Sequence, residues 1–194
     1  MILEALRNFD DIHTHVKAGP KSICSLPPKE AMALSRSDID QPYSIMLHPW
    51  YTNQQMIEDF VEAVDFCASD PRFVAIGECG FDANCQTPFP MQEKSLTIAL
   101  QSARKHQKPV ILHVVKSWDA LFAAVDLTFG LSGAISADAE GCRMIVHGFR
   151  KNEVFAQQLI RLGYYISLGG KYNPKVLSTI DKDRIYFETD NSAM

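Results

Sequence analysis

Short apolar runs alternate along this chain with longer segments in which apolar residues recur every three or four positions. The eight runs are FDDIHTH (9–15), SICSL (22–26), YSIMLHP (43–49), FVAIGE (73–78), PVILHV (109–114), CRMIVHG (142–148), YYISLG (164–169) and RIYFETD (184–190). Near-continuous apolar strands that alternate with helices are typical of a parallel sheet covered by helices. SICSL carries the weakest strand signal of the eight.

The intervening segments carry helix signals, clearest in residues 52–69, 91–106, 152–163 and 173–180. Thr52 and Gln55 have the spacing of a capping box at the start of the first segment. One apolar stripe along that segment is formed by Met56, Phe60, Val64 and Cys67. Gly163 has the position of a C-terminal cap. Asn173 has the position of an N-cap, and Pro174 follows it at the first helical residue.

Eight strands predict a closed (β/α)8 barrel rather than an open doubly wound sheet, in a single domain over residues 1–194. The chain is short for that fold, which typically takes roughly 250 residues. Only six residues separate His15 from Ser22, and the chain stops four residues after Asp190. We therefore expect a shortened barrel that lacks helices after the first and last strands. Residues 1–7, or a second copy in a homo-oligomer, would cover the open outer flank, and a truncated chain is the alternative.

Composition excludes some classes of partner. The 19 basic and 23 acidic residues give a net charge of −4, so the overall field does not hold this chain on nucleic acid. No apolar run has membrane-spanning length, and the start MILEALRNFDD lacks the apolar core of a signal peptide. The five cysteines form no CxxC pair and are odd in number, which favours reduced thiols in the cytoplasm.

Polar residues gather where the predicted strands end. The strand ends carry His13, His15, His48, Glu78, His113, His147, Glu188 and Asp190. The carboxyl ends of barrel strands face one shared mouth, where barrel enzymes place their chemistry. A lone histidine is most often a satisfied core residue, but so many unpaired imidazoles and carboxylates are expensive to bury together without a cation. The pattern therefore predicts a metal centre.

Two divalent ions account for the donors better than one. One set is His13, His15 and Asp190, the other is His113 and His147, and Glu78 bridges the two. Each ion then keeps an open position for water, and Asp190 is the expected general base. In a strand, Asp11 would share a face with His13 and orient a histidine ring from one layer deeper. Imidazole-rich sites favour Zn, Mn, Fe or Ni over Mg, although such ions exchange.

In this order, the motifs DDIHTH, MLHPW, AIGECGFD, VILHV, IVHGF and YFETD resemble the TatD family of metal-dependent hydrolases, within the amidohydrolase-like barrels. The resemblance implies a binuclear phosphodiesterase, usually a deoxyribonuclease that works from the 3′ end, while some relatives act on aminoacyl-tRNA. It implies metal ligands at His13, His15, Glu78, His113, His147 and Asp190. It also implies a substrate-site role for His48, and Asp82 of the GFD motif is expected to order the loop or a neighbouring ligand.

The sequence departs from the family pattern around the expected substrate pocket. Val115 stands where the family generally has arginine, and Arg150 stands where serine or threonine is usual. GFDAN lacks the aromatic residue that commonly follows the aspartate, and ETDNSAM lacks the usual proline. These departures predict an intact metal site beside an altered pocket.

Candidate substrate contacts follow the later strands. Lys116, Arg150 and Lys171 come directly after the fifth, sixth and seventh strands and are expected to bind phosphate. The loop GGKYNP (169–174) offers backbone N–H groups for the same purpose. Trp50 has the position to stack a base. The expected substrate is therefore nucleic acid or a smaller phosphodiester.

Two other interpretations stay open at this level. One is a different amidohydrolase-like hydrolase or deaminase with one functional metal, because a glutamate at the end of the fourth strand fits either site. The other is a non-catalytic paralogue that keeps metal for stability and binds a partner, which the missing helices and altered pocket motifs suggest.

Overall fold

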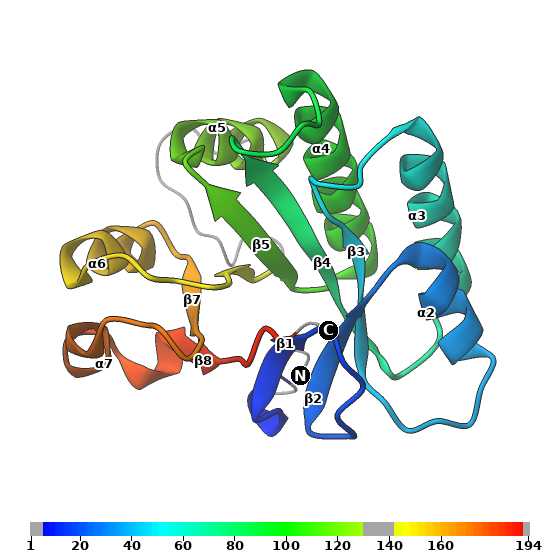
Figure 1. Cartoon of the computed structure of the whole chain (residues 1–194), viewed down its shortest axis with the longest axis horizontal. Helices are drawn as coiled ribbons and strands as arrows, with labels where there is room; N and C mark the ends of the chain where they lie inside the picture. The colour runs from blue at the N-terminus through cyan, green and yellow to red at the C-terminus, as the bar shows by residue number, and fades with distance from the viewer. Residues whose placement is uncertain (1–5, 130–141, 192–194) are drawn as a thin grey trace.

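The structure is a computed structural model that describes residues 6–129 and 142–191. Its eight strands form one sheet in chain order, and each neighbouring pair is parallel (Figure 1). They are β1 (Asp11–Thr14), β2 (Ser22–Leu26), β3 (Tyr43–Leu47), β4 (Phe73–Asp82), β5 (Val110–Val115), β6 (Met144–Val146), β7 (Tyr165–Leu168) and β8 (Ile185–Phe187). All eight predicted strands are confirmed, including the weak second one.

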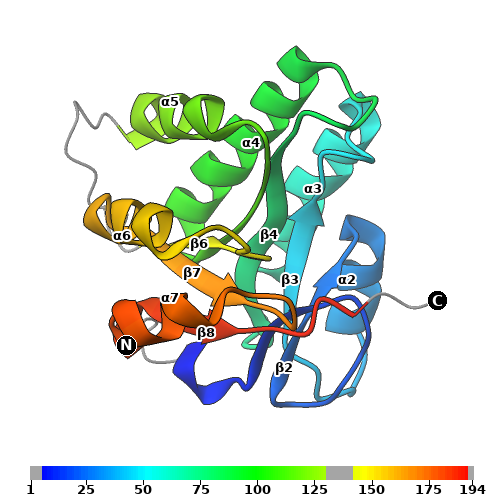
Figure 2. The ribbon, with the colours of Figure 1, turned by 60° about the vertical axis from the view of Figure 1, so that its left-hand side comes forward.

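The helices cover the outside of the sheet (Figures 1 and 2). They are α2 (Pro28–Ser35), α3 (Gln54–Cys67), α4 (Phe89–His106), α5 (Trp118–Phe129), α6 (Glu153–Arg161) and α7 (Pro174–Thr179). Short 3₁₀ turns lie at Leu6–Asn8 and Lys182–Arg184. Within the described residues no helix joins β1 to β2 or follows β8, so the shortened (β/α)8 barrel is confirmed. None of these helices is long and apolar enough to cross a membrane.

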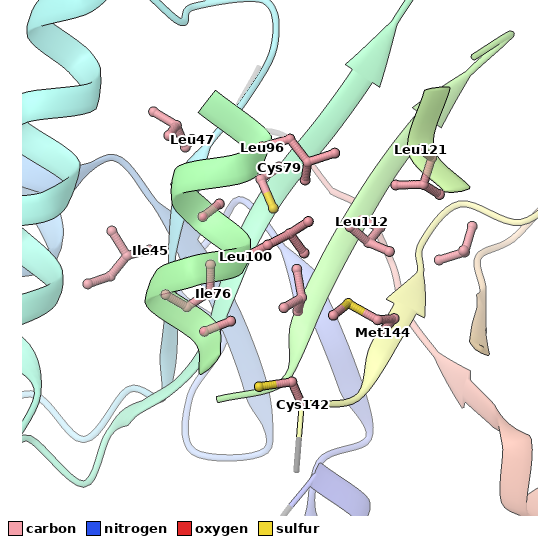
Figure 3. Packing of buried hydrophobic residues seen from close by; sticks show 14 of the residues in the cluster. Ile45, Leu47, Ile76, Cys79, Leu96, Leu100, Leu112, Leu121, Cys142 and Met144 are labelled. Carbon is pink, nitrogen blue, oxygen red and sulfur yellow. The ribbon is translucent and has the colours of Figure 1, made fainter. Parts of the chain in front are cut away.

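The main core lies between the strands and their covering helices. Leu96 and Leu100 of α4 pack towards Ile76 of β4 and Leu112 of β5, and all four are fully buried (Figure 3). Each such side chain contributes roughly 1.5–3 kcal/mol through burial. Cys79 of β4 also lies in this layer (Figure 3). The helix layer therefore fixes which side chains of β4 and β5 turn into the barrel.

A second apolar cluster fills part of the barrel interior. It consists of Leu6, Ile12, Ile23, Ile145, Tyr165 and Tyr186. The neighbours of Ile145 on β6, Met144 and Val146, belong to the outer core, so alternation along the strand turns Ile145 inward. Leu6 packs against these interior residues, so the expectation that residues 1–7 cover the outer flank is wrong for Leu6. Residues 1–5 lie outside the described residues.

Phe187, the last residue of β8, has 49% of its surface exposed, on the flank where no helix follows the strand within the described residues. The expected homo-oligomer that covers this flank stays a prediction.

Two local predictions need correction. Thr52 does not cap α3: its hydroxyl donates to the His48 carbonyl at 2.8 Å, and the side chain of Asn53 accepts from Met56 N at 2.9 Å. Asparagine is at least as good an N-cap as threonine, so the cap moves by one residue. The fourth strand also continues past Glu78 to Asp82, because these residues keep their ladder with β5. Asn173 caps α7 as predicted.

Candidate metal centre

Glu78 is the hub of the barrel mouth. Its Oε1 lies 2.5 Å from His113 Nδ1, 2.7 Å from His147 Nε2 and 3.2 Å from His48 Nε2. Its Oε2 lies 3.3 Å from Nε2 of both His13 and His15. The carboxylate therefore turns one oxygen to each of the two histidine sets that the sequence separates.

Asp190 completes the first set. Its Oδ1 lies 3.7 Å from the Nε2 atoms of His13 and His15, and 36% of its side chain is exposed at the mouth. Two backbone bonds hold these residues together: Asp190 N donates to His13 O at 3.0 Å, and His15 N donates to Asn191 O at 2.8 Å. The segment after β8 thus closes the barrel beside β1 and brings Asp190 into one site with His13 and His15.

The donors fit a cation. The side chain of His13 is fully buried, and neither ring nitrogen has a hydrogen-bond partner among the described residues. Such orphaned atoms are rare in native proteins and call for an unseen ion or water. Three overlapping groups bring ligand atoms within 4.8 Å of one another: His13, His15 and Glu78; His13, His147 and Asp190; and His48, Glu78 and His113. Imidazole with carboxylate suits a transition-metal ion.

The charges of the cluster are coupled. Burial alone would raise the pKa of Glu78, but the positive charge of His147, the hydrogen bond from His113 and the close contact with His13 hold this pKa well below its usual value. Burial alone would lower the pKa of His147, but the charges of Glu78 and Glu188 raise it well above 6.5. The site therefore attracts positive charge strongly, whether as a proton or as a metal ion.

Two carboxylates stand behind the histidines of the second set. Asp82 Oδ2 lies 3.1 Å from His113 Nε2, and Glu188 Oε1 lies 3.5 Å from His147 Nδ1. In each case the opposite ring nitrogen faces Glu78. Carboxylates in this position fix the tautomer of a ligating histidine and leave its other nitrogen free for metal. The contact of Asp82 is the one expected of a residue that orders a neighbouring ligand.

His48 turns its protonated ring nitrogen towards Glu78, whereas His113 and His147 turn theirs towards Asp82 and Glu188. His48 Nδ1 accepts a hydrogen bond from Trp50 N at 3.1 Å, so its proton sits on Nε2, the atom 3.2 Å from Glu78. A nitrogen that carries a proton is a donor and offers no lone pair to a metal. The network therefore separates His48 from the metal-ligand candidates and makes it a hydrogen-bond donor at the mouth.

Asp11 does not orient a histidine ring as the sequence suggested. Its Oδ1 accepts from the backbone N–H of His13 and of Thr189, each at 3.1 Å, and its Oδ2 accepts from the Thr189 hydroxyl at 2.6 Å. The strict alternation on which that interpretation rested fails because the β1–β2 register shifts between Asp11 and Thr14. Asp11 instead ties β1 to the segment after β8.

The mouth opens into a cavity of about 590 Å³. Its lining includes His15, His48, Glu78, His113, His147 and Asp190. Lys116, Arg150 and Lys171 are exposed and are not among the lining residues. Lys116 instead reaches Asn84 Oδ1 at 3.3 Å. The phosphate-binding role of these three cations stays a prediction.

Sequence reasoning gave no role to two residues that shape the site. The Glu188 side chain is fully buried and accepts from Gly148 N at 2.6 Å, which anchors the turn after His147. Ser25 Oγ accepts a hydrogen bond from Glu78 N at 3.3 Å and donates one to Gly77 O at 3.4 Å. The sequence could have indicated Glu188, because it lies at the end of the eighth apolar run, where alternation turns it to the interior. Nothing in the sequence pointed to Ser25, which lies in the weakest predicted strand.

Fold and donor set together place the chain among the (β/α)8 barrels with a histidine and carboxylate cluster at the mouth. The family model described as TatD related DNase matches residues 28–192. The chain belongs to this family. The solved YjjV, a TatD homologue from Escherichia coli, superposes with a TM-score of 0.74 at 23% identity over 98% of this chain and 80% of that one. A TatD family hydrolase from Entamoeba histolytica gives 0.67 at 23% identity, over 97% and 64%.

Curated relatives give the same family. The 3′-5′ ssDNA/RNA exonuclease TatD of Cronobacter turicensis is 31% identical over 133 residues, which are 63% of this chain and 47% of the relative. The protein of the same name from Salmonella typhimurium is 29% identical over 126 residues, 64% and 44%. The chain thus spans about half the length of the curated relatives it matches.

The position of Glu188 leads to a testable prediction. Because Glu188→Ala removes the acceptor facing His147 Nδ1, we expect the Kd for Mn²⁺ to rise about 10–100-fold, the effect of losing an outer-shell partner. Glu188→Gln keeps an acceptor for Gly148 N–H but loses the charge, and an intermediate Kd is expected. Imidazole ¹⁵N shifts of the metal-free protein, followed against pH, should show a lower His147 pKa in Glu188→Ala, because Glu188 is one of the groups that raise it. An unchanged pKa and Kd would contradict the assignment.

Proposed function

We propose that this chain is a metal-dependent phosphodiesterase that acts on the ends of single-stranded nucleic acid. One observation carries the proposal: Glu78 turns its two oxygens to two histidine sets, His13 with His15 and His113 with His147, at the mouth of one cavity. The family relatives described as 3′-5′ ssDNA/RNA exonucleases support the substrate class. A bridged pair of sites favours this function over a single-metal deaminase.

The proposed ligands are His13, His15 and Asp190 for one divalent ion and His113 and His147 for the other, with Glu78 between them. When bound, the two ions supply an acidic water and offset the charge of the phosphoryl oxygens. Zn, Mn, Fe and Ni suit this donor set best, and Mg is the alternative.

The protein's own groups then have separate tasks. Asp190, the partly exposed carboxylate at the lip, takes the proton released as water attacks phosphorus. His48 presents its Nε2–H to the cavity and is placed to donate to a phosphoryl oxygen. Asp82 and Glu188 hold the rings of His113 and His147 while charge develops. We also place the chain in the cytoplasm, where its cysteines would stay reduced.

The proposal is tested by hydrolysis with controlled metal. With Mn²⁺, we expect the protein to shorten 5′-labelled single-stranded DNA from its 3′ end and to cleave bis(p-nitrophenyl) phosphate. A chelator should abolish both activities and Mn²⁺ should restore them. Asp190→Asn should lower kcat by about 10²–10⁴-fold, the usual contribution of a general base. Metal-loaded protein that cleaves neither substrate, or cleavage that survives chelation, would overturn the proposal.

A further inference from the structure

The cavity has an aromatic wall beside the candidate metal centre. Trp50 and Tyr51 line it with 56% and 57% of their surface exposed, among the most exposed large apolar side chains in the described residues. Their ring centroids are 6.5 Å apart, and the Trp50 ring lies edge-on to His48 at 5.4 Å. Exposed aromatic faces in a cavity are typical of a stacking surface, because every nucleobase presents a π-face.

Trp50 is held rigidly although its face is exposed. Its Nε1–H donates to Asp82 Oδ2 at 2.6 Å, and its backbone N–H donates to His48 Nδ1 at 3.1 Å. Asp82 itself is 2% exposed, so the anchor is buried while the platform is not. A platform ordered in advance loses little conformational entropy when a ligand stacks on it.

Asp82, which holds Trp50 in place, also contacts a proposed metal ligand. Asp82 Oδ2 receives the Trp50 Nε1–H and also lies 3.1 Å from His113 Nε2. One carboxylate oxygen therefore connects the exposed indole with a proposed metal ligand. A base stacked on Trp50 would lie next to the reacting phosphate.

The charge of the cavity lining limits which part of a substrate can lie there. Apart from the proposed metal and substrate residues, Glu30 is the one charged side chain among the described residues that line the cavity, and no lysine or arginine is among them. A carboxylate only accepts hydrogen bonds and repels phosphate. Away from the proposed metal and substrate residues, the cavity therefore suits a terminal base and not the continuing backbone.

We propose that Glu30, Trp50 and Tyr51 form a nucleobase subsite that prefers guanine at the reacting end of the substrate. The inference rests on the proposed function, which it makes more specific. The Watson–Crick edge of an unpaired guanine carries two adjacent donors, N1–H and N2–H₂, which match the two oxygens of a carboxylate. Thymine offers one N–H between two carbonyls and fits worst. Adenine and cytosine each place one donor beside an acceptor.

Binding is tested first, without any reaction. The sequence contains two tryptophans, so Trp118→Phe leaves Trp50 as the reporter. Titration of this variant with Mn²⁺ and dGMP should quench its fluorescence, with a Kd about tenfold lower than for dTMP. The sugar phosphate deoxyribose 5-phosphate, which lacks a base, should cause no quenching. Equal Kd values for dGMP, dAMP, dCMP and dTMP would overturn the subsite.

Substitutions then test the Glu30 carboxylate and the stacking face of Trp50 separately. Glu30→Gln should reduce the dGMP preference to within about twofold, while the exposed Glu93→Gln on α4 serves as the matched control and should keep it. Trp50→Ala should raise the KM for single-stranded DNA about tenfold, and Trp50→Phe, which keeps an aromatic face, should raise it far less. Both lose the bond to Asp82, so kcat should fall by a similar factor in the two. A KM that is the same in Trp50→Ala and wild type would overturn the stacking role.

The two proposals fail in different ways. If the protein binds dGMP selectively but cleaves no phosphodiester, the hydrolase proposal fails and the subsite is supported. If it cleaves DNA and bis(p-nitrophenyl) phosphate but treats oligonucleotides ending in G and T alike, only the subsite fails.

Discussion

Replacing Glu78 with alanine is expected to remove both proposed metal ions and to abolish the proposed metal-dependent hydrolysis. Glu78 holds Oε2 3.3 Å from His13 and His15 and Oε1 2.5 Å from His113 and 2.7 Å from His147, and its side chain is 3% exposed. Outer-shell partners of a metal typically account for 10–100-fold in affinity. A bridging ligand should account for more, and we expect the Kd for Mn²⁺ to rise by over about 100-fold at both sites.

Elemental analysis of purified protein gives the direct measurement. Wild-type protein should hold close to two ions per chain after dialysis against micromolar Mn²⁺ or Zn²⁺, and Glu78→Ala should hold almost none. Glu93→Gln removes an exposed carboxylate and should leave the content unchanged. Two ions retained in Glu78→Ala, or none bound by wild-type protein in excess metal, would contradict the bridged centre.

The same variant has a pH signature in the metal-free state. The pKa of His147 is raised in the folded protein because Glu78 and Glu188 favour its charge over the opposing effect of burial. That contribution to stability is fully present below about pH 6.5 and is lost as the pH rises through the raised value. Glu78→Ala removes one of the two carboxylates that raise the pKa of His147. The free energy of unfolding of this variant should therefore vary less with pH above about 6.5 than that of wild-type protein. Urea titrations of both proteins at several pH values measure the difference.

Much of the site was predictable because barrel strands end at a common mouth. The apolar runs ended in His13, His15, Glu78, His113 and His147, and the structure brings all five together. That inference needed only the strand positions and the geometry of a closed parallel sheet. Their role as metal ligands stays a prediction that the elemental analysis tests.

The wrong predictions share a physical origin, because they depend on backbone geometry over a few residues within or beside one helix or strand. Alternation along a strand placed Asp11 on the face of His13, but the register shift in β1 turned its carboxylate to backbone N–H groups. Sequence spacing suggested Thr52 as the cap of α3, but its hydroxyl donates to the His48 carbonyl and the side chain of Asn53 caps the helix instead. Local backbone geometry decides where such side chains point, and hydrophobic periodicity carries no information about it.

A glycine in β4 gives the prediction with the largest expected effect on stability. Gly80 of β4 has φ +148°, and a Cβ added there would lie 2.0 Å from the carbonyl oxygen of His113 on β5. No side chain can move to relieve this contact, because the obstacle is backbone held in the β4–β5 ladder at this very pair. Gly80→Ala must therefore separate the strands that carry Glu78 and His113.

We expect Gly80→Ala to destabilise the protein by more than the roughly 3 kcal/mol that bounds most single substitutions, and to weaken metal binding in whatever protein still folds. Gly170→Ala is the matched control, since a Cβ there meets nothing within 4 Å. Thermal unfolding and urea titration compare the two variants. Metal-free proteins are used because bound ions would add their own stabilisation. If Gly80→Ala unfolded at the same urea concentration as Gly170→Ala, β4 and β5 could not lie in this register, and the distance between Glu78 and His113 would have to be wrong as well.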